Sequence, residues 1–189
     1  TFDFRDRPVN PTSGAIFDLA VEFANPFFFS QQEEDLTIDY YKLTSRNRFY
    51  FPLSDRTVIA MYTAFGIQEN LATGTNSSGE KAGFIPGIKV FRLIGADIIR
   101  GYEDNEMNRL DSGEDISAVE VDTRAYMVNL KFEPRYYITE SMILGVFYDA
   151  GRVFVDEFDT NDLKSSAGLS FKYLTPVGTL DFDYGIKLL

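Results

Sequence analysis

Residues 142–151 read MILGVFYDAG, and two kinds of side chain alternate along them. One side is apolar throughout and carries Met142, Leu144, Val146 and Tyr148. The other side carries Ile143, Gly145, Phe147 and Asp149. A helix would repeat its apolar side chains about every 3.6 residues, whereas successive residues of a β-strand point to opposite faces. The stretch therefore predicts a strand with one apolar face and one face that holds a carboxylate.

The same two-residue period recurs in four more stretches, at 14–25, 126–133, 167–173 and 180–187. Less regular strands are expected at 35–51 and 57–67, with a short one at 1–5. In the stretch 35–51 the apolar parity changes at Tyr40 and Tyr41, which predicts a β-bulge or a strong bend. The sequence thus predicts about eight strands and no convincing helix.

The connections between these strands alternate in length. Short ones, rich in Pro, Gly, Ser and Asp, are expected at 7–13, 52–56, 137–141 and 175–178. Longer ones are expected at 26–34, at about 68–124 and at 156–165. Structureless loops longer than about 12–15 residues are uncommon in compact domains, so we expect the middle one to be functional or self-structured. Short turns at one end and long loops at the other are typical of an up-and-down barrel in an outer membrane.

Composition excludes several classes of protein. The chain has 189 residues and a net charge of −11, which argues against a nucleic-acid-binding protein because such domains carry a basic face. It has no Cys and no His, so thiolate nucleophiles, the commonest general base and the commonest zinc ligands are missing. We therefore expect no enzyme, no cofactor and no metal site.

Two all-β folds explain the alternation equally well. A soluble sandwich buries its apolar face, whereas a membrane barrel turns that face to lipid and lines its lumen with the charged one. Aromatic residues gather near the expected strand ends, at 27–29, 49–51, 136–137 and 173. Such aromatic girdles, and strands of about 9–11 residues, suit a bilayer crossing. We therefore predict an all-β, antiparallel up-and-down transmembrane β-barrel.

Three short motifs stand out in this framework. The long loop carries Ile99-Arg100-Gly101-Tyr102, a strand carries Phe147-Tyr148-Asp149-Ala150-Gly151, and a turn carries Thr175-Pro176-Val177-Gly178. Together with DFRD at 3–6 and NPTSG at 10–14, they span nearly the whole chain. In this order and spacing they resemble the C-terminal half of the bacterial surface antigen superfamily barrel. That superfamily includes the BAM-complex insertase, the translocation and assembly module and the two-partner secretion transporters.

The resemblance implies a specific contact inside the barrel. In this superfamily the sixth extracellular loop folds back into the lumen, and its Arg, here Arg100, reaches the acidic residue of the Phe-x-Asp-x-Gly strand, here Asp149. A guanidinium offers a planar fork that suits a carboxylate, so the pairing is physically reasonable. Gly101 permits the sharp turn and the close backbone approach that the loop needs.

The sequence departs from the superfamily pattern at two places. Paired glycines often precede the Arg motif, but here Gly95 is followed by Ala96. An acidic residue is common near Lys131, and Glu133, two residues further on the same face, is the expected substitute. Inward carboxylates are expected to form mixed-charge networks with Lys42, Arg46 and Lys187; these carboxylates are Asp18, Glu22, Asp181 and Asp183.

The resemblance also implies the extent and the role of the chain. A barrel of this superfamily has sixteen strands, so residues 1–189 are expected to be its C-terminal part, with the POTRA domains and remaining strands elsewhere or with the barrel completed by other chains. The implied function is an assembly factor of the Gram-negative outer membrane that inserts other β-barrel proteins. Its implied partners are outer-membrane lipid, unfolded barrel clients and accessory lipoproteins.

Other functions fit the same barrel. It is also appended to patatin-like phospholipases, whose catalytic residues would lie outside this stretch, and it forms the pore of two-partner secretion transporters. If the ordered motifs are coincidental, the chain is instead a porin or a soluble all-β binding module.

Overall fold

The computed structural model describes residues 1–28, 32–33, 36–72, 75, 79, 83–95, 98–159 and 162–188. Eight strands form one antiparallel sheet in the order β1-β2-β5-β6-β7-β8-β9-β10. They are β1 (Phe2–Asp3), β2 (Gly14–Ala24), β5 (Tyr40–Ser54), β6 (Thr57–Asn70), β7 (Arg124–Tyr137), β8 (Met142–Val155), β9 (Lys164–Thr175) and β10 (Gly178–Leu188). A separate hairpin consists of β3 (Gln32–Glu33) and β4 (Leu36–Thr37). The prediction of an all-β, up-and-down antiparallel fold is confirmed.

Within the described residues, helical structure is confined to single turns. The α-helix α1 spans Asp104–Met107, and 3-10 helices span Pro26–Phe28, Gly87–Lys89 and Ile116–Ala118. In the part of the chain that the structure describes, no helix has the length and apolar character needed to span a membrane.

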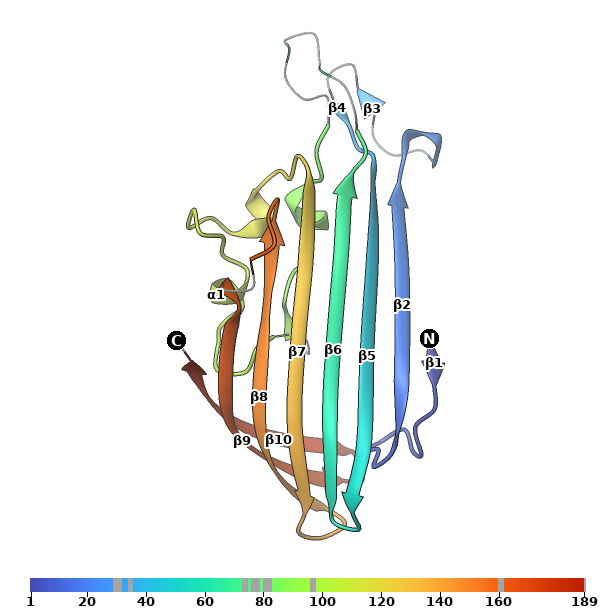
Figure 1. Cartoon of the computed structure of the whole chain (residues 1–189), viewed down its shortest axis with the longest axis vertical. Coiled ribbons are helices and arrows are strands. Elements are labelled where there is room, and N and C mark those ends of the chain that lie inside the picture. The colour runs from blue at the N-terminus through green and yellow to red at the C-terminus, as the bar shows by residue number, and fades with distance from the viewer. Residues whose placement is uncertain are drawn as a thin grey trace.

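The sheet is a curved wall with a loop on its concave side. Strands β5 to β8 stand side by side, while β9 and β10 sweep across behind them at the lower end (Figure 1). The connection between β6 and β7 runs from 71 to 123 and packs against the wall behind β6 to β8. Tight turns join β5 to β6, β7 to β8 and β9 to β10 at the opposite end from the long connections.

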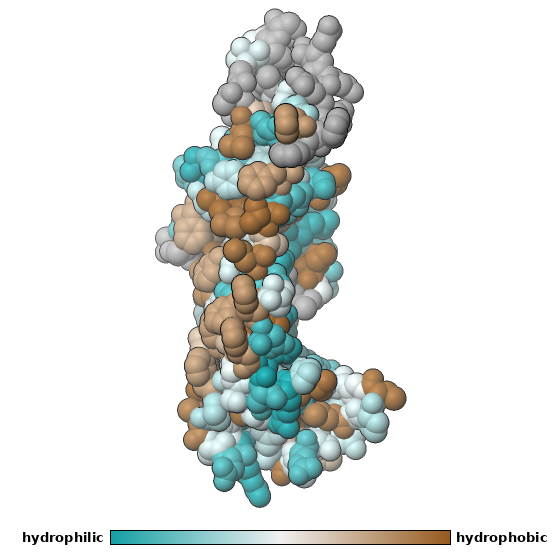
Figure 2. Space-filling model, turned by 90° about the vertical axis from the view of Figure 1, so that its right-hand side faces the viewer, coloured by the Kyte–Doolittle hydropathy of each residue, from teal (hydrophilic) through white to brown (hydrophobic). Residues whose placement is uncertain are grey.

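The two faces of the wall have different surroundings. Large apolar side chains on the convex face are exposed, and they include Leu19 (64%), Val21 (54%), Phe23 (65%), Leu169 (62%), Phe182 (62%) and Tyr184 (72%). Figure 2 shows hydrophobic residues gathered along one flank of the upright wall. Because successive residues of a strand alternate between faces, the polar residues between them point to the concave side. This arrangement, apolar outside and polar inside, is that of a lipid-facing barrel wall.

The hydrophobic core lies between the wall and the long loop. The strands contribute Tyr40, Tyr62, Ala64, Ala125, Met127 and Val153, and the loop contributes Ile85, Val90, Phe91, Leu93, Ile99, Met107, Ile116 and Val121. Gly66 of β6 makes room for this packing, because a Cβ at that position would lie 2.5 Å from the ring of Phe91. The loop therefore fills the concave side of the wall as a packed element.

Three details differ from the sequence prediction. The expected bulge at Tyr40 and Tyr41 is wrong, because β5 begins at Tyr40 and its register with β2 is regular through both residues. The parity changes there because Leu36 belongs to the separate hairpin. The irregularity in β5 instead lies between Pro52 and Ser54, where proline cannot donate a ladder hydrogen bond. The strands β6 to β9 are also longer than the predicted 9–11 residues, at 12–14 residues.

Candidate functional site

The IRGY segment of the long loop forms a tight turn against the wall. The Tyr102 N–H donates to the Ile99 carbonyl at 3.1 Å, and Gly101 adopts a φ of +89°. A Cβ at Gly101 would lie 3.1 Å from the carbonyl carbon and oxygen of Gly185 in β10. Two glycines thus let the loop backbone approach the strand backbone closely, which larger residues at either position would oppose.

Arg100 extends from this turn to three carboxylates on three strands. Its Nε and Nη2 donate to Asp149 Oδ2 and Oδ1 at 2.8 and 2.9 Å, and its backbone N–H reaches Oδ2 at 3.3 Å. Its Nη1 donates to Glu133 Oε2 at 2.7 Å and lies 3.5 Å from Asp183 Oδ1. The guanidinium therefore joins β8, β7 and β10 to the loop through one side chain.

The other motif residues pack around this guanidinium. The Phe147 ring lies under it, with 3.6 Å between the guanidinium carbon and the ring centroid. Gly151 accommodates Ile99, since a Cβ there would lie 3.1 Å from Ile99 Cδ1. The Tyr102 hydroxyl donates to the Ser165 carbonyl at 3.2 Å, which adds β9 to the strands that hold the loop.

The Arg100 cluster continues into a wider network of charges. Glu133 also accepts from Arg135 Nε at 2.7 Å and lies 3.6 Å from Lys172 Nζ, which is itself 3.3 Å from Asp181. Asp149 is fully buried and Glu133 is 5% exposed. Removing one member of a buried network leaves another charge without its partner, so the members depend on one another.

The electrostatic surroundings favour the charged form of Arg100. Burial alone would lower the pKa of its guanidinium, but the hydrogen bonds that it donates to Asp149 and the charges of Asp149 and Glu133 outweigh burial and raise the pKa above its ordinary value. Arg100 is therefore a permanent cation whose contacts fix the position of the loop.

Wall lysines hold the loop at further points. Lys42 Nζ donates to the Lys89 carbonyl at 2.7 Å, and Lys131 Nζ donates to the Ile98 carbonyl at 2.7 Å. Lys164 Nζ donates to the Glu106 carbonyl. Sequence reasoning missed these contacts because every residue has a carbonyl, so no motif marks the acceptor.

The structure brings together most of the residues that the sequence singled out. Arg100, Asp149 and Glu133 form one cluster, and Ile99, Gly101, Tyr102, Phe147 and Gly151 surround it. Asp18 and Glu22 lie opposite the expected Arg46 and Lys42 in the β2–β5 ladder. The other two inward carboxylates have partners that were not expected: Asp183 meets Arg100 and Asp181 meets Lys172, while Lys187 pairs with Glu106 at 2.5 Å. These pairings depend on where the loop lies, which strand periodicity does not encode. Ala96 lies outside the described residues.

The chain that forms this outward apolar wall and this inward loop with its Arg-carboxylate cluster also matches a known family. Residues 1–188 match the family model of the Omp85 superfamily domain. The chain belongs to the Omp85 superfamily. The predicted resemblance to the bacterial surface antigen barrels is thereby confirmed, and so is the predicted location in the bacterial outer membrane.

Two relatives of this Omp85 chain are informative. It is 28% identical over 193 residues to the outer membrane protein assembly factor BamA of Nitratidesulfovibrio vulgaris, which it matches along 100% of its own length and 22% of that protein's. It resembles the crystal structure of BamA from Haemophilus ducreyi lacking POTRA domains 1–3 with a TM-score of 0.66 and 16% identity, over 99% of this chain and 37% of that one. At that identity the structural likeness establishes the fold, and the chain spans about a fifth of the curated relative.

Proposed function

We propose that this chain is the C-terminal part of an outer-membrane assembly factor, with the remaining strands and POTRA domains in a longer protein. The similarity to BamA, which extends along the whole length of this chain, supports this proposal. The observation that carries it is the Arg100 cluster, which ties an in-folded loop to β7, β8 and β10 at once. Such a contact would keep this part of the barrel wall rigid. An assembly factor needs a rigid part if another part of its barrel opens to accept a client.

In the proposed mechanism the wall is a rigid support, and the client is bound through main-chain hydrogen bonds. An incoming strand of a client barrel would pair with an exposed sheet edge, which gives affinity through main-chain hydrogen bonds. No nucleotide and no catalytic residue takes part. The Arg100 latch, defined here as Arg100 with Asp149 and Glu133, would keep the loop and the wall together while another part of the barrel accepts the client.

The proposed partners follow from this mechanism. Unfolded β-barrel proteins are the clients, outer-membrane lipid surrounds the apolar face, and accessory lipoproteins bind the longer protein. Nucleic acid is not a partner, in keeping with the net charge of −11.

Reconstitution of the full-length protein tests the proposed function. The protein is placed in phosphatidylcholine vesicles, an unfolded barrel client is added, and client folding is followed by heat-modifiable gel mobility. Client folding is expected to be faster than in empty vesicles and slower again with the Arg100→Ala variant. Arg92→Ala is the matched control, because Arg92 lies in the same loop and makes a more exposed 3.5 Å pair with Asp115. Equal folding rates with and without the wild-type protein would contradict the proposal.

A further inference from the structure

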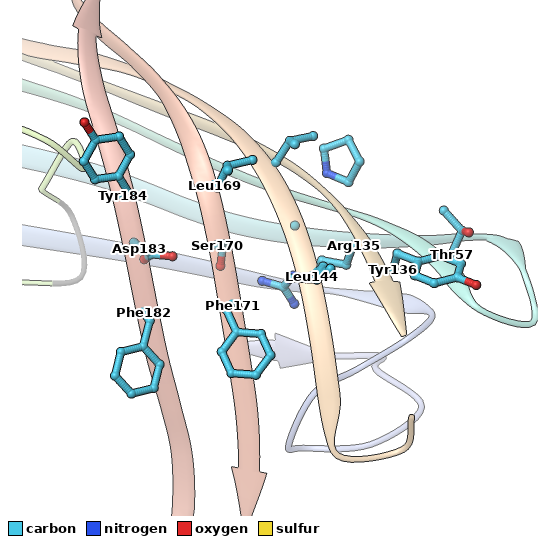
Figure 3. Close-up of a pocket in the computed structure, with 13 residues that line it drawn as sticks. Thr57, Arg135, Tyr136, Leu144, Leu169, Ser170, Phe171, Phe182, Asp183 and Tyr184 are labelled. Carbon is cyan, nitrogen blue, oxygen red and sulfur yellow. The ribbon is translucent and has the colours of Figure 1, made fainter. Parts of the chain in front are cut away.

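The convex face of the wall contains an apolar groove near the tight-turn end. It has a volume of about 640 Å³ and lies across β7, β8, β9 and β10. Figure 3 shows side chains of neighbouring strands around it, among them Leu144, Leu169, Phe171, Phe182 and Tyr184. The volume lies within the range of about 300–1,000 Å³ that is usual for ligand pockets.

The groove is bordered by two rows of outward side chains. One row crosses the sheet through Val146, Leu169 and Tyr184, which are register neighbours. The second row runs through Tyr136, Leu144, Phe171 and Phe182 in the same way. The rings of Phe171 and Phe182 stand 6.3 Å apart, so the second row ends in an aromatic wall.

A gap in the pairing of β7 with β8 lies at the base of the groove, while β7 stays paired with β6 there. The register of β7 with β8 runs as far as Phe132 opposite Tyr148 and resumes at Arg135 opposite Gly145. Pro134 lies in this gap and lines the groove. Proline has no backbone N–H and is confined in sheets to edges and irregular places, so the sequence itself places the recess here.

The chemistry of the lining selects a hydrocarbon ligand. The two charged residues that border the groove direct their charges to the other face: Arg135 Nε lies 2.7 Å from Glu133, and Asp183 lies 3.5 Å from Arg100. The exposed side chains that remain are aliphatic or aromatic, such as Leu144 (47%) and Leu169 (62%). A ligand in the groove therefore gains apolar burial and few hydrogen bonds.

We propose that this groove binds an acyl chain of an outer-membrane lipid. The groove is continuous with the lipid-facing side of an Omp85 wall, so membrane lipid is the molecule that surrounds it. A polypeptide is a poorer occupant, because β8 and β9 are paired with neighbours on both sides and a peptide's own backbone groups would lack partners. An acyl chain has no such groups. The proposal stands independently of the assembly function.

Lipid retention by the intact protein tests this site. The protein is purified in detergent, mixed with dioleoyl phosphatidylethanolamine, and examined by mass spectrometry under non-denaturing conditions. Wild-type protein is expected to retain lipid, and Leu169→Trp, which fills the groove, is expected to lose at least about tenfold in affinity, equivalent to 1.4 kcal/mol. The matched control is Leu19→Trp, because Leu19 is equally exposed, at 64% against 62%, on the same face of β2. Equal retention by all three proteins overturns the proposal.

A measurement on the unmodified protein keeps the proposal testable if the tryptophan variants fail to fold. The intact protein is placed in vesicles that contain a phospholipid with a photoreactive diazirine in its acyl chain, and labelled peptides are mapped after irradiation. Labelling concentrated on residues 134–146 and 169–184 supports the site. Labelling spread evenly over the convex face overturns the proposal in favour of general lipid contact. Labelling that an added unfolded client protein blocks overturns it in favour of a peptide site.

Discussion

At the scale of single residues, the site depends on one guanidinium that meets two buried carboxylates, Asp149 and Glu133. Arg100 meets Asp149 through two parallel hydrogen bonds, the geometry in which a guanidinium binds a carboxylate best. Asp149 has no exposed surface, and its ladder neighbour Ser166 is also buried. Arg100 therefore contributes to stability mainly because, without it, buried carboxylates would lose the positive charge that compensates them.

Replacing Arg100 with alanine is expected to lower the free energy of unfolding by about 3–5 kcal/mol, the cost of leaving a buried charge without its partner. Arg100→Lys should recover only part of this loss, because an ammonium cannot make the two parallel bonds to Asp149. Urea unfolding of the intact protein in detergent, followed by heat-modifiable mobility, measures both. A stability of Arg100→Ala within about 0.5 kcal/mol of wild type would show that the latch is dispensable.

The turn glycine allows a sharper comparison. Gly101 and Gly113 have nearly the same φ, +89° and +88°, but a Cβ at Gly101 meets the Gly185 backbone at 3.1 Å, while one at Gly113 meets nothing within 4 Å. Both alanine variants should lose about 1–2 kcal/mol from the left-handed conformation. Gly101→Ala should lose more, because the loop must also move away from β10. Equal losses in the same unfolding assay would mean that the close approach is unimportant.

At the scale of elements, the long loop behaves as a packed layer of the fold. Its Phe91 ring rests on Gly66 of β6, and Ile85 of the loop makes two backbone hydrogen bonds with Val121 across the loop itself. The loop buries its apolar side chains against the wall, so it gains stability from tertiary packing despite its short helical turns. Wall lysines and Arg100 then add fixed points along its length.

Filling the space under Phe91 is expected to loosen this layer. Gly66→Val places atoms where the Phe91 ring now lies, and such overpacking typically costs about 1–3 kcal/mol. The loop should then become more accessible, so limited proteolysis of the folded protein should cleave within 71–123 at a higher rate. Phe65→Val is the control, because Phe65 is the β6 neighbour of Gly66 and its side chain is 49% exposed on the opposite face of the strand, away from the loop. Unchanged cleavage in Gly66→Val would argue against tight packing of the loop.

At the scale of the whole molecule, the two faces of the wall meet different solvents. Leu19 lies on the convex face at 64% exposure, and its neighbour Ala20 lines the concave side with Glu22 and Lys42. In a membrane the convex face contacts lipid, so exposure there does not mean contact with water. The face of the wall on which a charged side chain lies therefore decides how much it lowers the stability of the protein in a membrane.

A pair of neighbouring substitutions tests this sidedness. Leu19→Arg is expected to lower the stability of the protein in a bilayer by up to about 2–4 kcal/mol, depending on its depth, because the charge faces lipid. Ala20→Arg should cost much less, since it faces the polar lumen. Refolding yield and urea unfolding in vesicles compare the two. A larger cost for Ala20→Arg would mean that the wall is oriented the other way, and equal costs would mean that the two faces do not meet different solvents.

Much of the site could be read from the sequence, but not all of its contacts. The motif order located Arg100 in the loop and Asp149 on the strand, and the face shared with Lys131 indicated Glu133. Asp183 was assigned to the correct face but to the wrong partners, because its neighbour is set by how deep the loop lies. The groove on the convex face was not predicted, since a proline within a strand announces an irregularity without giving its shape.

The strands of the large sheet, their two faces and the family could be predicted from the sequence, because each depends on local order: a period of two and short motifs in a fixed succession. Most contacts across long separations, and the geometry of all of them, depend on the tertiary structure. Residues 49 positions apart form the Arg100–Asp149 pair, and Gly101 meets Gly185, only because the loop turns into the concave side of a curved wall. Curvature, loop depth and close backbone contact arise from packing many residues at once, and no single stretch of sequence contains them.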